Sequence, residues 1–142
     1  MNTKKRFLVS ALDWGYGHVT RTSVRVEQLA HLGHEIVVAC SPSQFHLWKK
    51  LHPEISIHAE LPENKITLHG SKSDMLSLML KYRKFKNNWK QEKNWVSQYV
   101  QSNSIDAIIS DNRYGFYHSD IPTTLITHQL NLQGPWPWIN FA

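Results

Sequence analysis

The sequence predicts an α/β domain: a doubly wound, Rossmann-like parallel sheet with helices on both faces. Short apolar runs alternate along the chain with longer segments of helical periodicity, which is the pattern of βαβ units. The second apolar run is also β-branched, as expected for a strand that is buried on both faces. A turn with two glycines, Gly15 and Gly17, joins the first run to the helical segment behind it. Together these observations predict an open parallel sheet.

The predicted elements follow one another in regular order. The strands are expected at residues 6–12, 35–40, 55–59, 106–111 and 123–128, and the helices at residues 18–32, 42–51 and 73–101, with a loop over 62–72. Gly33 is a usual residue to end the first helix. Ser41 is the expected cap of the second helix, and Pro42 stands in its first turn.

With right-handed crossovers, the usual order of such strands in a doubly wound sheet is 3-2-1-4-5. The first and fourth strands are then neighbours, and the chain leaves them in opposite directions. Ligands bind in the crevice at such a point, beyond the carboxyl ends of the strands. His18 follows the first strand, Asp111 ends the fourth and His128 ends the fifth. We therefore expect these three polar residues at one edge of the sheet.

Size and composition set the class of protein. The chain has 142 residues, enough for one domain with a core, and its sole cysteine, Cys40, indicates a reducing compartment. No stretch reaches transmembrane length, and the first apolar run is too short for a signal peptide, so we expect a cytoplasmic protein. The net charge of +5 suits phosphates, nucleic acid or anionic lipid, but on charge alone a lysine-rich surface is the favoured explanation.

The turn at Gly15 and Gly17 is the first candidate site. Its glycines let a ligand approach the backbone closely, and the helix start offers N–H groups and a positive dipole end to an anion. His18 stands there as a candidate general base, because the dipole favours neutral imidazole. Thr20 and Arg21 lie in the same turn, within reach of a phosphate. The alternatives are a purely structural turn, a solvent-facing histidine and a solvated arginine.

The second candidate site follows the fourth strand. Asp111 is placed to orient His18 as the partner of a catalytic base, and Asn112 and Arg113 come next as candidate binding residues. The alternative is an aspartate that caps the next loop, with Arg113 as its salt-bridge partner.

A third polar group follows the fifth strand. His128, Gln129 and Asn131 come directly after a buried strand and are candidates to hold acceptor hydroxyls or phosphate. A hydrogen-bonded loop plug is the competing interpretation.

Several site classes are excluded or ranked low. The third glycine of the dinucleotide fingerprint is Thr20 here, and no acidic residue closes the second strand, so a nicotinamide or flavin site is not expected. No histidine pair has metal-ligand spacing, and we predict no metal. The long helix has one strongly basic face, which suits a solvated surface better than peripheral contact with anionic lipid. Nucleic acid ranks last as a partner, because no motif for it is present.

Four motifs, taken in order, resemble the N-terminal half of the GT-B glycosyltransferases: residues 13–21, 33–37, 110–115 and 127–131. The likeness spans residues 6–133 and is nearest to bacterial enzymes similar to MurG, which add N-acetylglucosamine to a lipid-linked precursor. Two departures stand out. The family's motif near His128 has a glutamate where this chain has Gln129, and its glycine turn is richer in glycine.

The resemblance implies that residues 1–142 form an acceptor-binding domain, with the nucleotide-sugar domain outside this chain. It implies an inverting transfer of a hexose or N-acetylhexosamine to a hydroxyl of a sugar acceptor, lipid-linked in the MurG-type enzymes, with His18 as the base. A nucleotide sugar such as a UDP-sugar would be the co-substrate, no cofactor is expected, and the domain alone should be inactive. The aromatic ending over residues 134–142 suits a chain cut inside a larger protein or, as the alternative, a natural tail that folds back on its own domain. The alternative is a non-catalytic domain that binds a phosphorylated or nucleotide ligand.

Overall fold

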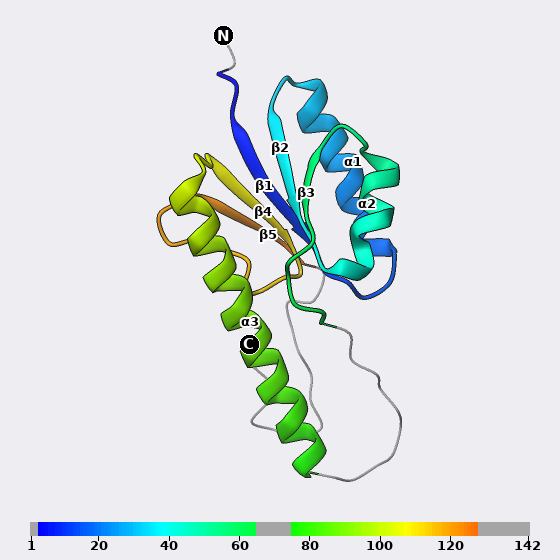
Figure 1. Ribbon diagram of the computed structural model, residues 1–142, viewed down its shortest axis with the longest axis vertical. Helices are drawn as coiled ribbons and strands as arrows, with labels where there is room; N and C mark the ends of the chain where they lie inside the picture. Colours follow the sequence, from blue (N-terminus) through cyan, green and yellow to red (C-terminus); the bar gives the residue numbers. More distant parts are fainter. Residues whose placement is uncertain (1–2, 65–74, 128–142) are drawn as a thin grey trace.

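The computed structural model describes residues 3–64 and 75–127 (Figure 1). Within these ranges the chain forms a five-stranded parallel sheet in the order β3-β2-β1-β4-β5. The strands are β1 (Arg6–Ala11), β2 (Glu35–Ala39), β3 (Ser56–His58), β4 (Ala107–Asp111) and β5 (Thr123–Ile126). Each strand lies within the range predicted for it, and the predicted fold class and strand order are confirmed.

Three helices connect the strands: α1 (Gly17–His31), α2 (Phe45–Leu51) and α3 (Met75–Ser102), with a 3₁₀ turn, η1 (Pro42–Gln44), ahead of α2. Gly33 ends α1 as predicted, because its φ of +84° suits glycine. The predicted cap at Ser41 is wrong in one respect. Its backbone precedes η1, but its hydroxyl bonds the Ser43 hydroxyl at 3.2 Å and caps no N–H group.

The two faces of the sheet carry separate apolar clusters, because neighbouring residues of a strand point to opposite faces. Val9 of β1 packs with Trp48 of α2 and other residues of α1 and α2 on one face. Leu8, its neighbour, packs with Val96 of α3 on the other face. Helices therefore cover both faces, and β2 is buried on both, as predicted.

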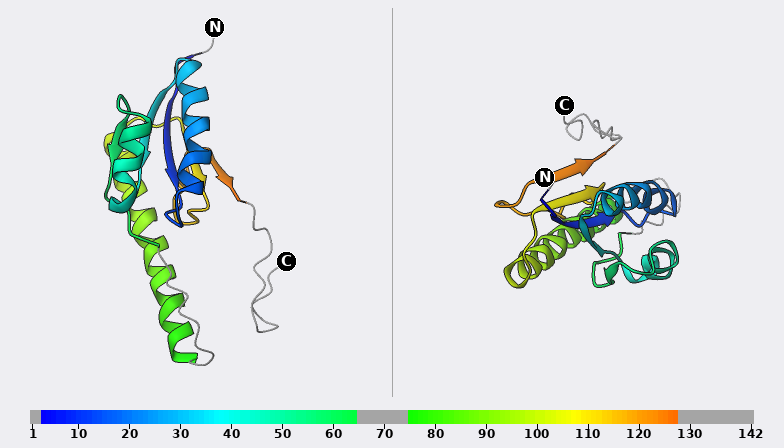
Figure 2. Two further views of the ribbon diagram at one scale, coloured as in Figure 1. Left: turned by 90° about the vertical axis from the view of Figure 1, so that its right-hand side faces the viewer. Right: turned by 90° about the horizontal axis from the view of Figure 1, so that it is seen from above.

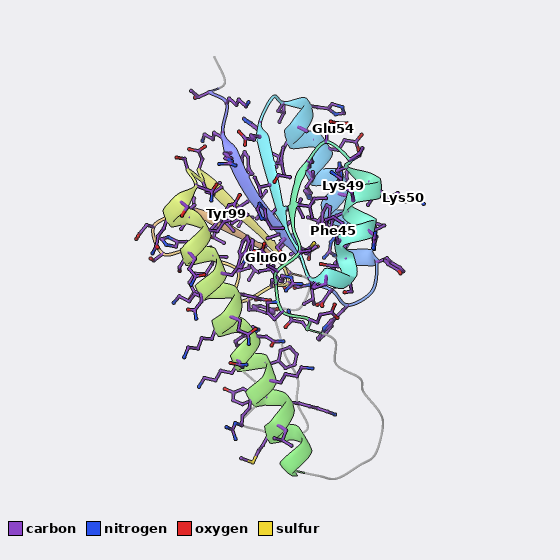
Figure 3. All side chains as sticks on the ribbon, viewed as in Figure 1. Phe45, Lys49, Lys50, Glu54, Glu60 and Tyr99 are labelled. Atoms are coloured by element: carbon purple, nitrogen blue, oxygen red, sulfur yellow. The ribbon has the colours of Figure 1, made fainter. Side chains whose placement is uncertain are left out.

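The N-terminal half of α3 extends past the carboxyl ends of the strands (Figures 1 and 2). Its side chains there include the exposed Met79, Leu80 and Tyr82. Figure 3 shows long side chains radiating from this half of the helix, whereas Tyr99, near its other end, lies over the sheet. The projecting half of α3 therefore flanks the sheet edge at which the loops after β1 and β4 emerge.

Candidate functional site

The site lies at the carboxyl ends of β1 and β4, which pair side by side with Ala11 opposite Asp111. The N–H of Leu12 donates to the Asp111 carbonyl at 2.9 Å and ties these two strand ends together. The chain passes from β1 to β2 on one side of this point, whereas β4 is followed by β5 on the other side. It is therefore the topological switch point of the sheet, where open α/β sheets bind ligands.

The glycine turn that follows β1 leaves the start of α1 open. Gly15 has a φ of +73°, a conformation that glycine adopts without strain. Within the described part of the chain, a Cβ atom at Gly15 or Gly17 would meet nothing within 4 Å. No side chain caps α1 at Tyr16. The geometry of this turn therefore suits a close and preferably anionic ligand.

His18 and Asp111 meet across the two strand ends. His18 Nδ1 lies 3.1 Å from Asp111 Oδ1, although the residues are 93 positions apart in the sequence. The His18 side chain is 13% exposed, and that of Asp111 is fully buried at 0%. The structure thus brings together the pair that the sequence analysis singled out as a base and its orienting carboxylate.

Two further side chains of α1 hold the same carboxylate. Arg21 donates from Nη2 to Asp111 Oδ1 at 2.6 Å and from Nε to Oδ2 at 3.2 Å. The Thr22 hydroxyl donates to Oδ2 at 2.8 Å. Arg21 was predicted to hold a phosphate, but here its guanidinium is engaged by Asp111.

Two contacts at Nδ1 bear on which nitrogen of the His18 ring carries the proton. Arg21 Nη2 also lies 3.2 Å from His18 Nδ1. A guanidinium is a donor only, so Nδ1 cannot both accept from Arg21 and donate to Asp111. The charged carboxylate is the stronger partner for the ring N–H, and Arg21 already donates to it at 2.6 Å. We therefore assign the proton to Nδ1, which leaves the lone pair on Nε2.

Thr20 is exposed in the first turn of α1, and its hydroxyl lies 3.2 Å from the Tyr16 carbonyl and 3.1 Å from the Gly17 carbonyl. Its role in phosphate binding stays a prediction. Asn112 is buried with a φ of 57°, so it makes the bend after β4. His128, Gln129 and Asn131 lie outside the described residues.

Arg113 corrects both interpretations made of it. Its side chain is 0% exposed, so it does not face a ligand, and its ion-pair partners are Glu92 and Asp13 rather than Asp111. It donates to Glu92 Oε1 at 2.7 Å and to the Ala11 carbonyl at 2.9 Å, and it lies 3.7 Å from Asp13 Oδ1. Arg113 therefore links α3 to the end of β1 as a structural residue.

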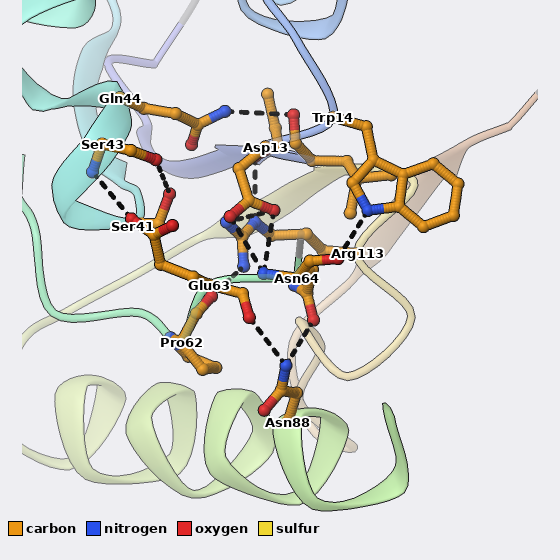
Figure 4. A network of polar contacts seen from close by, with 12 residues as sticks. Asp13, Trp14, Ser41, Ser43, Gln44, Pro62, Glu63, Asn64, Asn88 and Arg113 are labelled. Atoms are coloured by element: carbon orange, nitrogen blue, oxygen red, sulfur yellow. Dashed lines mark hydrogen bonds and ion pairs between the residues drawn. The ribbon is translucent and has the colours of Figure 1, made fainter. Parts of the chain in front are cut away.

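Arg113 belongs to a buried polar network that supports the glycine turn (Figure 4). The Asp13 carboxylate accepts from the Asn64 N–H at 2.9 Å, and the Asn64 side chain donates to Glu92 at 2.8 Å. Trp14, next along the turn, donates from its ring to the Asn64 carbonyl at 2.7 Å. The network thus fixes the residues just before Gly15 against α3.

An aromatic row extends from the glycine turn along α3 to the loop after β4. The ring of Trp14 lies 6.3 Å from that of Phe85, Phe85 lies 6.3 Å from Trp89, and Trp89 lies 5.8 Å from Tyr114. Trp14, Trp89 and Tyr114 are each exposed. The row therefore offers flat apolar surface between the glycine turn and the loop after β4.

The described residues give no support for a cysteine nucleophile, a metal site or a membrane-spanning helix. Burial raises the pKa of the Cys40 thiol to about 12, so this cysteine is not a nucleophile at neutral pH. Among the described residues, no three His, Cys, Asp or Glu side chains gather closely enough to hold a metal ion. No helix of the described part is long and apolar enough to cross a membrane.

The sequence analysis missed Thr22, Asn64 and Glu92. For Glu92 a signal was present: it is the one acidic residue of α3, and it stands three positions after Trp89 and four before Val96, on the apolar face of the helix. An acid at such a position is buried and needs a partner. Thr22 and Asn64 carry no comparable signal, because their contacts are with residues 89 and 28 positions away.

Comparison with known proteins identifies the fold. No family model matches the chain, and no curated protein matches it. Among solved structures, it is similar to the calicheamicin glycosyltransferase CalG4 (TM-score 0.64, 15% identity, 87% of this chain and 32% of that one). It is similar to the kitacinnamycin glycotransferase (TM-score 0.61, 14% identity, 87% of this chain and 30% of that one). It is also similar to Arabidopsis thaliana UGT89C1 complexed with quercetin (TM-score 0.53, 14% identity, 79% of this chain and 30% of that one).

The C-terminal domain of a hydrogenase from Pyrococcus furiosus also matches (TM-score 0.51, 12% identity, 89% of this chain and 95% of that one). The chain thus spans about a third of the length of the glycosyltransferases, where it matches one Rossmann-like domain. It spans nearly all of the hydrogenase domain. At these identities the likeness identifies the fold. The finer resemblance to MurG-type enzymes stays a prediction.

Proposed function

We propose that this chain is the acceptor-binding half of an inverting, nucleotide-sugar-dependent glycosyltransferase. The single observation that carries the proposal is the His18–Asp111 pair, 3.1 Å apart at the switch point of the sheet. The likeness of the fold to one half of three glycosyltransferases supports it. The donor would be held mainly by a second domain outside this chain.

The reaction is a direct displacement. Nε2 of His18 takes the proton of an acceptor hydroxyl as its oxygen attacks the anomeric carbon of the sugar. The bond from that carbon to the nucleotide diphosphate breaks, and the diphosphate leaves with the electron pair. Asp111 stabilises the imidazolium that forms, as the carboxylate does in other histidine bases. A base in this position contributes roughly a hundredfold to ten-thousandfold in rate.

The remaining parts of the site fit the two substrates. The N–H groups at the start of α1 suit an oxyanion of the diphosphate. The aromatic row suits an acceptor with a flat apolar surface, which would place its hydroxyl toward His18. Aromatic faces stack on sugar rings and on aromatic rings, so the row does not choose between these two acceptor types.

The test is a nucleotide-sugar screen with the complete gene product, followed by a comparison of two variants. His18→Ala should lose most of the transfer rate while the protein stays folded. His31→Ala is the matched control, because His31 is exposed at the opposite end of the same helix. Equal transfer by His18→Ala and wild type would refute the role of His18.

A second candidate is a non-catalytic domain that binds a phosphorylated or nucleotide ligand. The match to the hydrogenase domain favours it only as to length, because this chain covers 95% of that domain but about a third of each glycosyltransferase. Calorimetric titration of the 142-residue chain with nucleoside diphosphates separates the candidates. Tight binding without transfer by the complete gene product would favour the binding domain.

A further inference from the structure

We propose that Arg21 and Thr22 are positioning residues, which act through Asp111 to hold the His18 ring in the form that a base requires. This inference rests on the proposed function. It assigns Arg21 a different task from the phosphate binding expected from the sequence.

The carboxylate of Asp111 is fixed at both oxygens. Oδ1 lies 3.1 Å from His18 Nδ1 and 2.6 Å from Arg21 Nη2. Oδ2 lies 3.2 Å from Arg21 Nε and 2.8 Å from the Thr22 hydroxyl. Rotation of the carboxylate would break bonds at both oxygens, so Oδ1 is held toward the His18 ring.

The negative charge of Asp111 leads to the same conclusion. Asp111 is 0% exposed, and a carboxylate without water requires a cation or several donors beside it. Arg21 supplies the full positive charge through two nitrogens, in the paired geometry that guanidinium groups form with carboxylates. A lysine at this position would supply the charge but could not bond both oxygens in this way.

The position of Arg21 also makes the proposal testable by chemical rescue. Its side chain is 42% exposed, although the oxygens it binds are buried. Removal of the side chain should therefore open a space that a guanidinium ion can enter from solvent. A residue that served only to pack the fold would not be replaced in this way.

The first experiment observes the ring of His18 by ¹⁵N NMR of the 142-residue chain. In the wild type we expect one tautomer, with the proton on Nδ1. In Arg21→Ala we expect signals of both tautomers, and added guanidinium should restore the single one. Arg25→Ala, which removes an exposed arginine one turn along α1, should leave the spectrum unchanged. An unchanged tautomer in Arg21→Ala would overturn the proposal.

Thr22 is tested by a pair of variants in the same measurement. Thr22→Ser keeps the hydroxyl and should keep the single tautomer. Thr22→Val keeps the shape but loses the donor to Oδ2, so it should give a mixture. If the two variants behave alike, the hydroxyl has no positioning role.

Kinetics of the complete gene product separate positioning from phosphate binding. Positioning predicts that Arg21→Ala lowers kcat tenfold or more, with the KM for the nucleotide sugar unchanged. A raised donor KM at unchanged kcat would instead show a phosphate ligand and overturn the proposal. The NMR result does not depend on transfer, so an absence of sugar transfer would reject the proposed function while the tautomer still tests Arg21.

Discussion

Replacement of Arg113 by methionine tests the buried polar network that supports the glycine turn. Methionine keeps much of the apolar length of the side chain but removes every donor. Arg113 is 0% exposed, and it bonds Glu92 at 2.7 Å and lies 3.7 Å from Asp13. The variant therefore leaves two buried carboxylates without their cation.

The expected loss of stability is large. Breaking a buried ion pair by removing one partner costs about 3–5 kcal/mol, because the remaining charge stays buried. A domain of this size is stable by only about 5–15 kcal/mol in total. Arg113→Met should therefore lose a large part of its free energy of unfolding.

Urea unfolding followed by tryptophan fluorescence measures this loss. Arg25→Met, an exposed arginine of α1, is the control and should change the free energy of unfolding by less than about 0.5 kcal/mol. Adding Glu92→Met to Arg113→Met should recover part of the loss, because it removes one uncompensated carboxylate. A loss below about 1 kcal/mol in Arg113→Met, or no recovery in the double variant, would refute the reasoning.

Three further predictions concern single residues. Burial raises the pKa of Cys40 to about 12, so iodoacetamide at pH 8 should label this thiol slowly in the native protein and quickly in urea. Equal labelling rates in the two conditions would contradict the burial of Cys40. Burial lowers the pKa of His52 below its ordinary 6.5, so the folded state binds its proton less well than the unfolded chain. The free energy of unfolding should thus fall as the pH decreases from about 6.5, and His52→Gln should make this pH dependence weaker in urea unfolding. An unchanged pH dependence in His52→Gln would contradict the role of His52. A methyl group at Gly115 would lie within 3 Å of three backbone atoms of Trp89, so Gly115→Ala should lower stability by about 1–3 kcal/mol in thermal unfolding. Gly17→Ala should match the wild type, because a methyl group there meets no atom of the described residues within 4 Å.

Local patterns in the sequence predict most of the fold. β1, β2 and β4 show as short apolar runs and β3 as an alternation of apolar and polar residues, and Gly33 marks the end of α1 because its backbone is left-handed. The strand order is the usual one for a doubly wound sheet with right-handed crossovers, so it is predicted without knowledge of the contacts. Since that order brings β1 beside β4, it also predicts the meeting of His18 with Asp111.

The remaining contacts depend on side-chain choices that local patterns do not contain. Arg21 had two partners available, an external phosphate or the carboxylate of a strand 90 residues away, and it binds the carboxylate. Arg113 follows Asp111 and Asn112 in the sequence, yet its partners are Glu92 and Asp13. The place of Glu92 on the apolar face of α3 indicates that it is buried, but helical periodicity does not show that its partner is Arg113.

A crystal structure of the complete gene product with an acceptor and an unreactive nucleotide-sugar analogue tests the central claim most directly. We expect the acceptor hydroxyl within about 2.6–3.2 Å of His18 Nε2, with the ring still bonded to Asp111. An acceptor bound with its hydroxyl far from this nitrogen, or a His18 ring turned away from Asp111, would contradict the account.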